Sequence, residues 1–140
     1  MGERAVEICV TDLASARAAG RGGADRVELC ADLASGGVTP SVGLIQQVVR
    51  EAGVPVHVLI RPRPGDFVYR PREFEVMTLD IQAAKQAGAA GVVLGVLLSD
   101  GKIDALSMKH FQLAATPLFI TFHRAFDLTP DRLAAIETLS

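Results

Sequence analysis

Five short apolar runs, rich in valine and isoleucine, recur along the chain, and a stretch with helical spacing of apolar residues follows each one. β-Branched runs of this kind are typical of strands. They cover residues 6–10, 27–30, 56–60, 91–96 and 118–122. Their starts lie 21 to 35 residues apart, which leaves room for one helix and two loops between successive strands. The pattern therefore predicts an α/β fold in which βα units build a parallel sheet.

Capping residues and helix breakers mark the helices expected between and after these runs. Residues that favour a first helical turn are Thr11 or Asp12, Pro71 and Asp104. A stripe of apolar positions predicts another helix over residues 41–52. Thr129 and Pro130 are expected to open the fifth helix, with an apolar face of Leu133, Ile136 and Leu139.

The two faces of the predicted sheet differ in polarity, because alternate side chains of a strand point to opposite sides. One face is wholly apolar and suits a surface covered by helices. The other carries largely polar or reactive side chains: Glu7, Cys9, Glu28, Cys30, His57, Leu59, Arg61, Val93, Gly95, Phe119, Thr121 and His123. A doubly wound sheet requires two apolar faces, whereas the interior of a closed barrel tolerates polar groups that pair. The pattern therefore favours a fold of the TIM (βα)8-barrel type.

The length of 140 residues indicates only part of such a barrel. The spacing of the runs gives about five βα units, whereas a complete TIM barrel has eight and about 250 residues. We therefore expect residues 1–140 to form a single, incomplete TIM-barrel domain with a parallel sheet. Unpaired strand edges promote association, so a homo-oligomer is expected.

Composition and charge exclude several classes of function. Hydrophobic residues make up 49% of the chain and charged residues 21%, which is typical of a globular domain. The net charge of −2 argues against binding to nucleic acid or to an anionic membrane surface. There is neither a membrane-spanning apolar run nor a signal-peptide pattern, and two cysteines fit a reducing compartment, so a cytoplasmic location is expected.

Charged side chains collect after the third and fifth strands, at the end of a barrel where active sites lie. Arginine and histidine side chains there are suited to binding a carboxylate or a phosphate. Buried glutamates on the inner face are suited to acid–base catalysis. The candidate ligand-binding residues are Glu7, Glu28, Arg61, Arg63, Asp66, His123, Arg124 and Asp127. The expected ligand is a small anionic molecule. The other interpretation is a buried network of glutamate and arginine that only supports the fold.

Cys9 and Cys30 occupy equivalent positions in a weak internal repeat, Val-Glu-Ile-Cys and Val-Glu-Leu-Cys. Two thiolates facing one interior are suited to a soft ion such as Cu(I), so both are candidate metal ligands. The alternative is that they pack as small hydrophobic side chains. The sequence contains neither a P-loop nor a dinucleotide-binding glycine motif, and no nucleotide cofactor is expected.

Several stretches together resemble the CutC family, historically called copper homeostasis proteins. They are VEICV (6–10), GGADRVELC (22–30), GGVTPS (36–41), HVLIRPR (57–63), GDF (65–67), DGKID (100–104) and TFHRAFD (121–127). The resemblance implies a TIM barrel, a cytoplasmic location and a role in copper handling, with Cys9 and Cys30 as Cu(I) ligands. It also implies eight βα units, of which this chain contains about five. The resemblance implies no established reaction. An alternative function therefore stays open: a TIM-barrel enzyme that acts on a small anionic metabolite through Glu28, Arg61 and His123.

Overall fold

A five-stranded parallel sheet, in the order β1-β2-β3-β4-β5, organises the computed structural model, which describes residues 4–140. The strands are β1 (Glu7–Val10), β2 (Arg26–Leu29), β3 (Val56–Leu59), β4 (Gly91–Leu94) and β5 (Phe119–Phe122). The α-helices are α1 (Leu13–Arg21), α2 (Val42–Glu51), α3 (Pro71–Gln86), α4 (Ala105–Ala115) and α5 (Arg132–Leu139). Two 3₁₀ helices, η1 (Leu33–Ser35) and η2 (Arg124–Leu128), follow β2 and β5. The predicted α/β fold of five βα units is confirmed.

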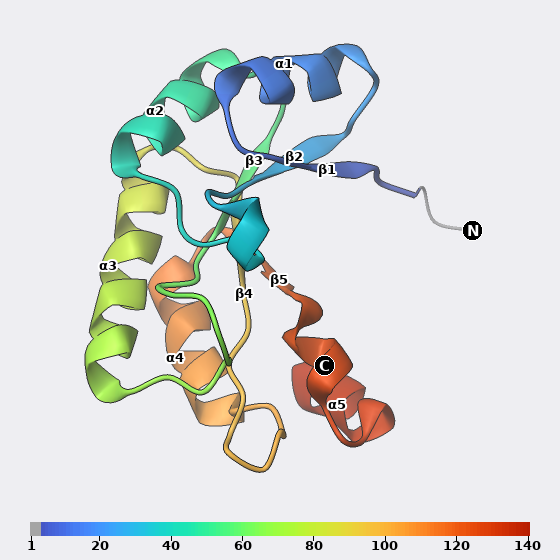
Figure 1. The fold of residues 1–140 in the computed structure, drawn as a ribbon, viewed down its shortest axis with the longest axis vertical. Helices are drawn as coiled ribbons and strands as arrows, with labels where there is room; N and C mark the ends of the chain where they lie inside the picture. The colour runs from blue at the N-terminus through green and yellow to red at the C-terminus, as the bar shows by residue number, and fades with distance from the viewer. Residues whose placement is uncertain (1–3) are drawn as a thin grey trace.

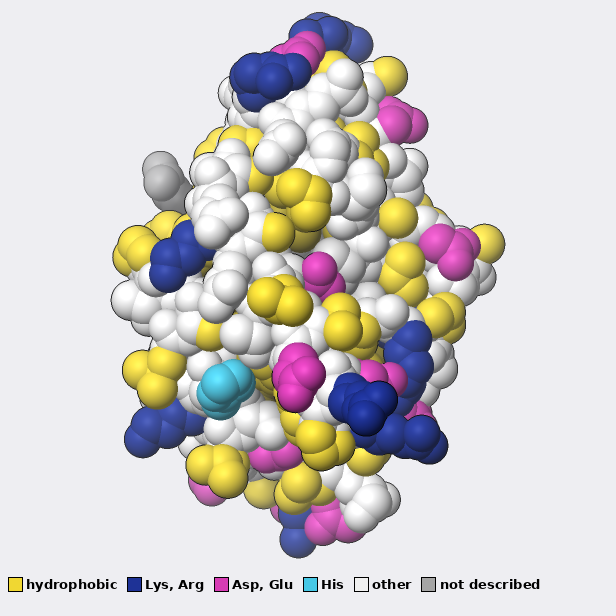
Figure 2. All heavy atoms as spheres, turned by 90° about the vertical axis from the view of Figure 1, so that its left-hand side faces the viewer, with side chains coloured by type: hydrophobic (Ala, Val, Ile, Leu, Met, Phe, Trp, Pro, Cys, Tyr) yellow, Lys and Arg dark blue, Asp and Glu magenta, His cyan; other side chains and the backbone are white. Residues whose placement is uncertain are grey.

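Helices α1 to α4 form an outer arc around the strands, which fan out inside it (Figure 1). Helix α5 follows β5 and η2 at the carboxyl-terminal end of the chain, and it lines a cavity together with α4 (Figure 1). Figure 2 shows the outer surface of the arc, where acidic, basic and hydrophobic side chains are interspersed. Within the described residues, no helix combines the length and hydrophobicity needed to cross a membrane.

The hydrophobic core lies between the sheet and this arc of helices. The residues that it buries in the strands, or within two residues after them, are Val10, Val27, Leu29, Val56, Val58, Ile60, Val92, Leu94 and Val96. Helix residues such as Ile45, Met77 and Phe111 pack against them and are fully buried. The predicted apolar face is therefore confirmed, except that Val6 and Ile8 are 50% and 41% exposed because β1 is an edge strand.

Most of the predicted helix starts are confirmed. Asp12 caps α1 by accepting a hydrogen bond from Ser15 N, and Asp104 caps α4 in the same way through Ser107 N. Helix α3 begins at Pro71.

The prediction for the fifth helix is wrong in two respects. Asp131, not Thr129, caps α5, because its carboxylate accepts hydrogen bonds from two backbone N–H groups. The expected apolar face is exposed: Leu133 by 76%, Ile136 by 52% and Leu139 by 40%. Strand β5 pairs only with β4 in the described sheet, so no second strand completes the groove in which a barrel helix packs.

Candidate functional site

The parallel register arranges the inward-facing side chains in rows across the sheet. Cys9 lies opposite Glu28, Glu28 opposite His57, and His57 opposite Gly91. One step nearer the carboxyl ends of the strands, Leu59 lies opposite Val93 and packs with it and Cys30 in a small apolar cluster. The apolar layer therefore separates a lower row, which contains Glu28, from the residues that follow the strands.

A cavity of about 270 Å³ opens on this inner face. It is lined by seven residues of the predicted polar face and by three from loops: Cys9, Glu28, Leu59, Arg61, Val93, Thr121 and His123, with Gly36, Phe67 and Arg124. The structure thus brings Glu28, Arg61, His123 and Arg124, four of the predicted ligand-binding residues, to one place.

Arg61 follows β3 and is only 3% exposed. Its guanidinium donates to backbone carbonyls, from Nη1 to Gly37 O at 2.7 Å and from Nη2 to Gly65 O at 2.9 Å. Nε is buried without a hydrogen-bond partner among the described residues. The carbonyls fix the position of this cation, but they do not neutralise its charge.

Arg124, at the start of η2, brings a second guanidinium to the same place. The Cζ atoms of Arg61 and Arg124 lie 5.1 and 5.4 Å from the centroid of the Phe67 ring. A Cβ atom built on Gly36 would collide with Nη2 of Arg124 and lie 3.3 Å from Nη1 of Arg61. The Gly36 turn therefore admits both guanidinium groups where a larger residue would displace them.

His123 directly follows β5 and lies against Phe67, with 4.8 Å between the ring centroids. Its Nδ1 accepts a hydrogen bond from Ala125 N at 3.2 Å, so the neutral ring carries its proton on Nε2. Nε2 is buried and has no partner in the described part of the chain. Burial lowers the pKa of His123 to about 4, and the charges of Arg61 and Arg124 add to this effect, so the ring is neutral near pH 7.

The carboxyl group of Glu28 changes its protonation state near neutral pH. Burial, and after it the neighbouring Glu7 carboxyl, raise the pKa of Glu28 to about 7 against the opposing charge of Arg26. Glu7 itself pairs with Arg26, from Nε to Oε2 at 2.5 Å, and does not line the cavity.

The two cysteines meet across β1 and β2, with 3.1 Å between their Sγ atoms. Cys9 is exposed and lines the cavity, whereas Cys30 is buried. Burial raises the pKa of the Cys30 thiol to about 12, and its hydrogen bond with Cys9 contributes to the shift. Within residues 4–140, no group of three or more His, Cys, Asp or Glu side chains is arranged to hold a metal ion.

Besides Glu7, three other predicted ligand-binding residues lie outside the cavity. Arg63 donates to Glu73 and to Asp66, and Asp66 is an exposed partner in that network. Asp127 is exposed on η2. His57, a member of the predicted polar face, is buried against Gly91, and its Nδ1 has no hydrogen-bond partner in the described chain.

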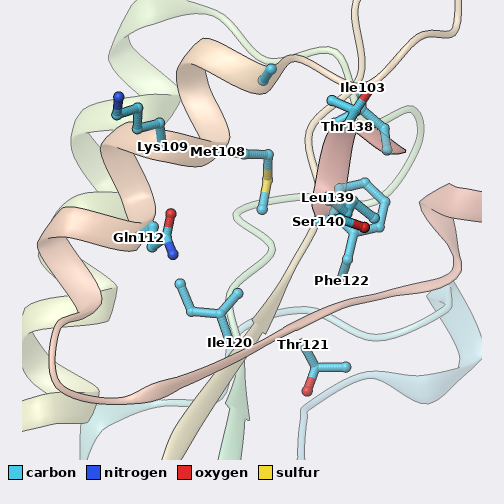
Figure 3. Close-up of a pocket in the computed structure, with 11 residues that line it drawn as sticks. Ile103, Met108, Lys109, Gln112, Ile120, Thr121, Phe122, Thr138, Leu139 and Ser140 are labelled. Carbon is cyan, nitrogen blue, oxygen red and sulfur yellow. The ribbon is translucent and has the colours of Figure 1, made fainter. Parts of the chain in front are cut away.

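A second cavity, of about 710 Å³, lies between α4, β5 and α5 (Figure 3). Ile120 of β5, Met108 of α4 and Leu139 of α5 line it. Apart from Thr121 it shares no residue with the smaller cavity, and none of the predicted site residues lines it. The candidate chemistry therefore belongs to the smaller cavity.

Sequence reasoning missed Gly36 and Phe67 as parts of the site. Both lie in stretches that carry the family resemblance, GGVTPS and GDF, and that was the available signal. Their contacts with Arg61 and Arg124 depend on how two loops fold over the sheet.

The sequence model of the CutC family matches residues 4–140. The chain belongs to the CutC family. It is 52% identical over 134 residues to the human copper homeostasis protein cutC homolog, and 51% identical over 132 residues to a CutC family protein of Agrobacterium fabrum. These alignments cover 96% and 94% of this chain, but 49% and 52% of the relatives. The chain thus spans about half the length of the curated relatives it matches.

The fold of this CutC family member is similar to a crystal structure of CutC from Streptococcus agalactiae. The TM-score is 0.90 at 37% sequence identity, and the match covers 98% of this chain and 68% of the other. The family relationship and the parallel α/β architecture therefore rest on both sequence and structure.

Proposed function

We propose that this chain functions in copper homeostasis in the cytoplasm, and that it binds Cu(I) between Cys9 and Cys30. The single observation that carries the proposal is the distance of 3.1 Å between the two Sγ atoms. The names of the human and mouse relatives, copper homeostasis protein cutC homologs, support the same role.

Thiolates are soft ligands that select Cu(I) over the harder divalent ions. Adjacent strands hold the two cysteines, so little of the backbone has to be reorganised to bring both sulfurs to one ion. The donor set fits an ion that accepts few ligands, because no third His, Cys, Asp or Glu side chain completes a cluster within the described residues.

The protonation of Cys30 sets the pH dependence of this binding. Because the pKa of Cys30 is raised to about 12, its thiol is protonated near pH 7 and must lose its proton when the ion binds. Affinity should therefore rise with pH, by about tenfold per pH unit for each proton displaced.

An anaerobic Cu(I) titration against a competing chelator tests the proposal. We expect the Cys9→Ser/Cys30→Ser double variant to lose high-affinity binding, and each single variant to bind much more weakly than the wild type. Equal affinity of the wild type and the double variant would contradict the proposal.

Met108→Leu is the matched control, because Met108 lines the larger cavity, which neither cysteine lines, and offers a soft sulfur there. Its substitution should leave the affinity for Cu(I) unchanged. The far-ultraviolet circular dichroism spectrum of each variant shows whether a loss of binding reflects a loss of folding.

A further inference from the structure

Positive charge in the smaller cavity is left without a counter-ion. None of the ion pairs formed by the described residues involves Arg61 or Arg124. Both guanidinium groups nevertheless lie over the Phe67 ring, at 5.1 and 5.4 Å from its centroid. Two like charges held at one place repel each other unless an anion lies between them.

Two buried N–H groups in the same cavity also lack partners. They are Nε of Arg61 and Nε2 of His123, which carries the ring proton. A buried donor without an acceptor is energetically unfavourable, so a ligand that accepts hydrogen bonds from both groups would be stabilised in this cavity. Arg61 is 97% buried, since its exposed fraction is 3%, so this is a built feature of the interior.

We propose that the cavity binds a small molecule through an oxyanion group, a carboxylate or a phosphate, held by Arg61, Arg124 and the Nε2–H of His123. Guanidinium groups match the planar carboxylate and the phosphate by paired hydrogen bonds. The volume of about 270 Å³ has room for roughly nine water molecules, which fits a small metabolite and not a nucleotide. The site goes beyond copper binding and uses neither thiol as a ligand.

Glu28 lines the same cavity two rows below Arg61, with the row of Leu59 and Val93 between them. The titratable and charged groups around it are Glu7 and Cys9 from β1, Arg26 from β2, Cys30 just after β2, and His57 from β3. With a pKa of about 7, it exchanges a proton near neutral pH. A ligand anchored by its anionic group presents its remaining atoms to this carboxyl, which is the arrangement of an acid–base enzyme acting on a small organic acid.

Titration with inorganic phosphate and with malonate, followed by the histidine ring signals in ¹H–¹³C NMR, tests the site. Either anion should shift the His123 signals and raise the pKa of His123, because the bound charge offsets those of Arg61 and Arg124. Comparison of the two anions shows whether the site prefers a phosphate or a carboxylate. Sodium chloride at matched ionic strength should produce no such shift.

Arg124→Gln is the decisive variant, because Arg124 is exposed and its side chain makes no hydrogen bond to another described residue. Its dissociation constant for the preferred anion should rise by about tenfold. Arg21→Gln, on the exposed carboxyl-terminal turn of α1, removes the same charge outside the cavity and should have no effect. Equal weakening by the two substitutions, or no shift of the His123 signals with either anion, would overturn the proposal.

The Cys30→Ser variant separates this site from the copper site, because Cys30 is a proposed Cu(I) ligand that does not line the cavity. It should bind the anion like the wild type, so failure of Cu(I) binding and failure of anion binding are independent results. Malonate binding should also weaken between pH 6 and pH 8, because Glu28 becomes negative over that range, and Glu28→Gln should remove this dependence. Malonate binding that is independent of pH in the wild type would exclude Glu28 from the site.

Discussion

Glu28 shows how the position of a carboxyl group on the inner face changes its chemistry. An ordinary glutamate has a pKa of 4.5, whereas burial and the Glu7 carboxyl raise that of Glu28 to about 7. Between these values the folded protein holds a proton that the unfolded chain has released. The stability that this proton confers is fully present below pH 4.5 and is lost as the pH rises through about 7.

The free energy of unfolding should therefore fall with rising pH over this window, with a contribution from Glu28 of at most about 1.4 kcal/mol per pH unit. Glu28→Gln should flatten the profile. Urea denaturation at several pH values between 5 and 8 measures it.

Glu75→Gln is the control, because Glu75 is exposed on α3. It should leave the pH profile parallel to that of the wild type. A Glu28→Gln profile with the wild-type slope would show that another group carries the dependence.

At the scale of elements, glycines in β4 and just after it leave space for side chains from the neighbouring strands. A Cβ atom on Gly91 would lie 2.6 Å from the ring of His57, and one on Gly95, just beyond β4, would lie 2.7 Å from the ring of His123. Both imidazole rings therefore occupy space that a side chain from this segment would otherwise fill.

We expect Gly91→Ala to lower the free energy of unfolding by about 1–3 kcal/mol, because the added methyl group overpacks a buried ring. Gly43→Ala is the matched control in α2, where an added Cβ meets nothing within 4 Å. That substitution should stabilise the protein by about 0.5–1 kcal/mol, since glycine is unfavourable inside a helix. Chemical denaturation of both variants measures the difference, and an equal response would contradict the steric argument.

The sequence predicted the elements well, because each strand is a run of alternating side chains and each cap is a local hydrogen bond. The runs at 56–60 and 118–122 correspond to β3 and β5 within two residues at each end. The contacts of the site were less predictable. The approach of Phe67 and Gly36 to the arginines depends on loops that meet only in three dimensions, and the exposure of Leu133 depends on what packs beside β5.

At the scale of the whole molecule, two features favour association. Strands β1 and β5 are the edges of the described sheet, and α5 exposes Leu133, Ile136 and Leu139. Unpaired edges and contiguous apolar surface are typical of sites that bind another chain.

We therefore expect this chain to form a homo-oligomer, with a sedimentation coefficient that increases with protein concentration. Leu133→Glu/Ile136→Glu should shift the protein towards the monomer, because the charges oppose burial of that face. Analytical ultracentrifugation over a wide range of concentration measures the effect.

Leu106→Glu is the control, since Leu106 is 82% exposed but lies on α4, outside this face. It should leave association unchanged. A wild-type protein that sediments as a monomer at every concentration would contradict the prediction.

The stagger between β1 and β2 places the two copies of the internal repeat in different surroundings. The Val-Glu-Ile-Cys and Val-Glu-Leu-Cys segments are nearly identical, but the register sets Cys9 level with Glu28 and not with Cys30. Glu7 consequently meets Arg26, while Glu28 lines a cavity, and one cysteine is exposed while the other is buried. The repeat on β2 is thus shifted by two residues relative to the repeat on β1. Because of this shift, the glutamate and the cysteine of each copy lie in chemically different environments although the residues are the same.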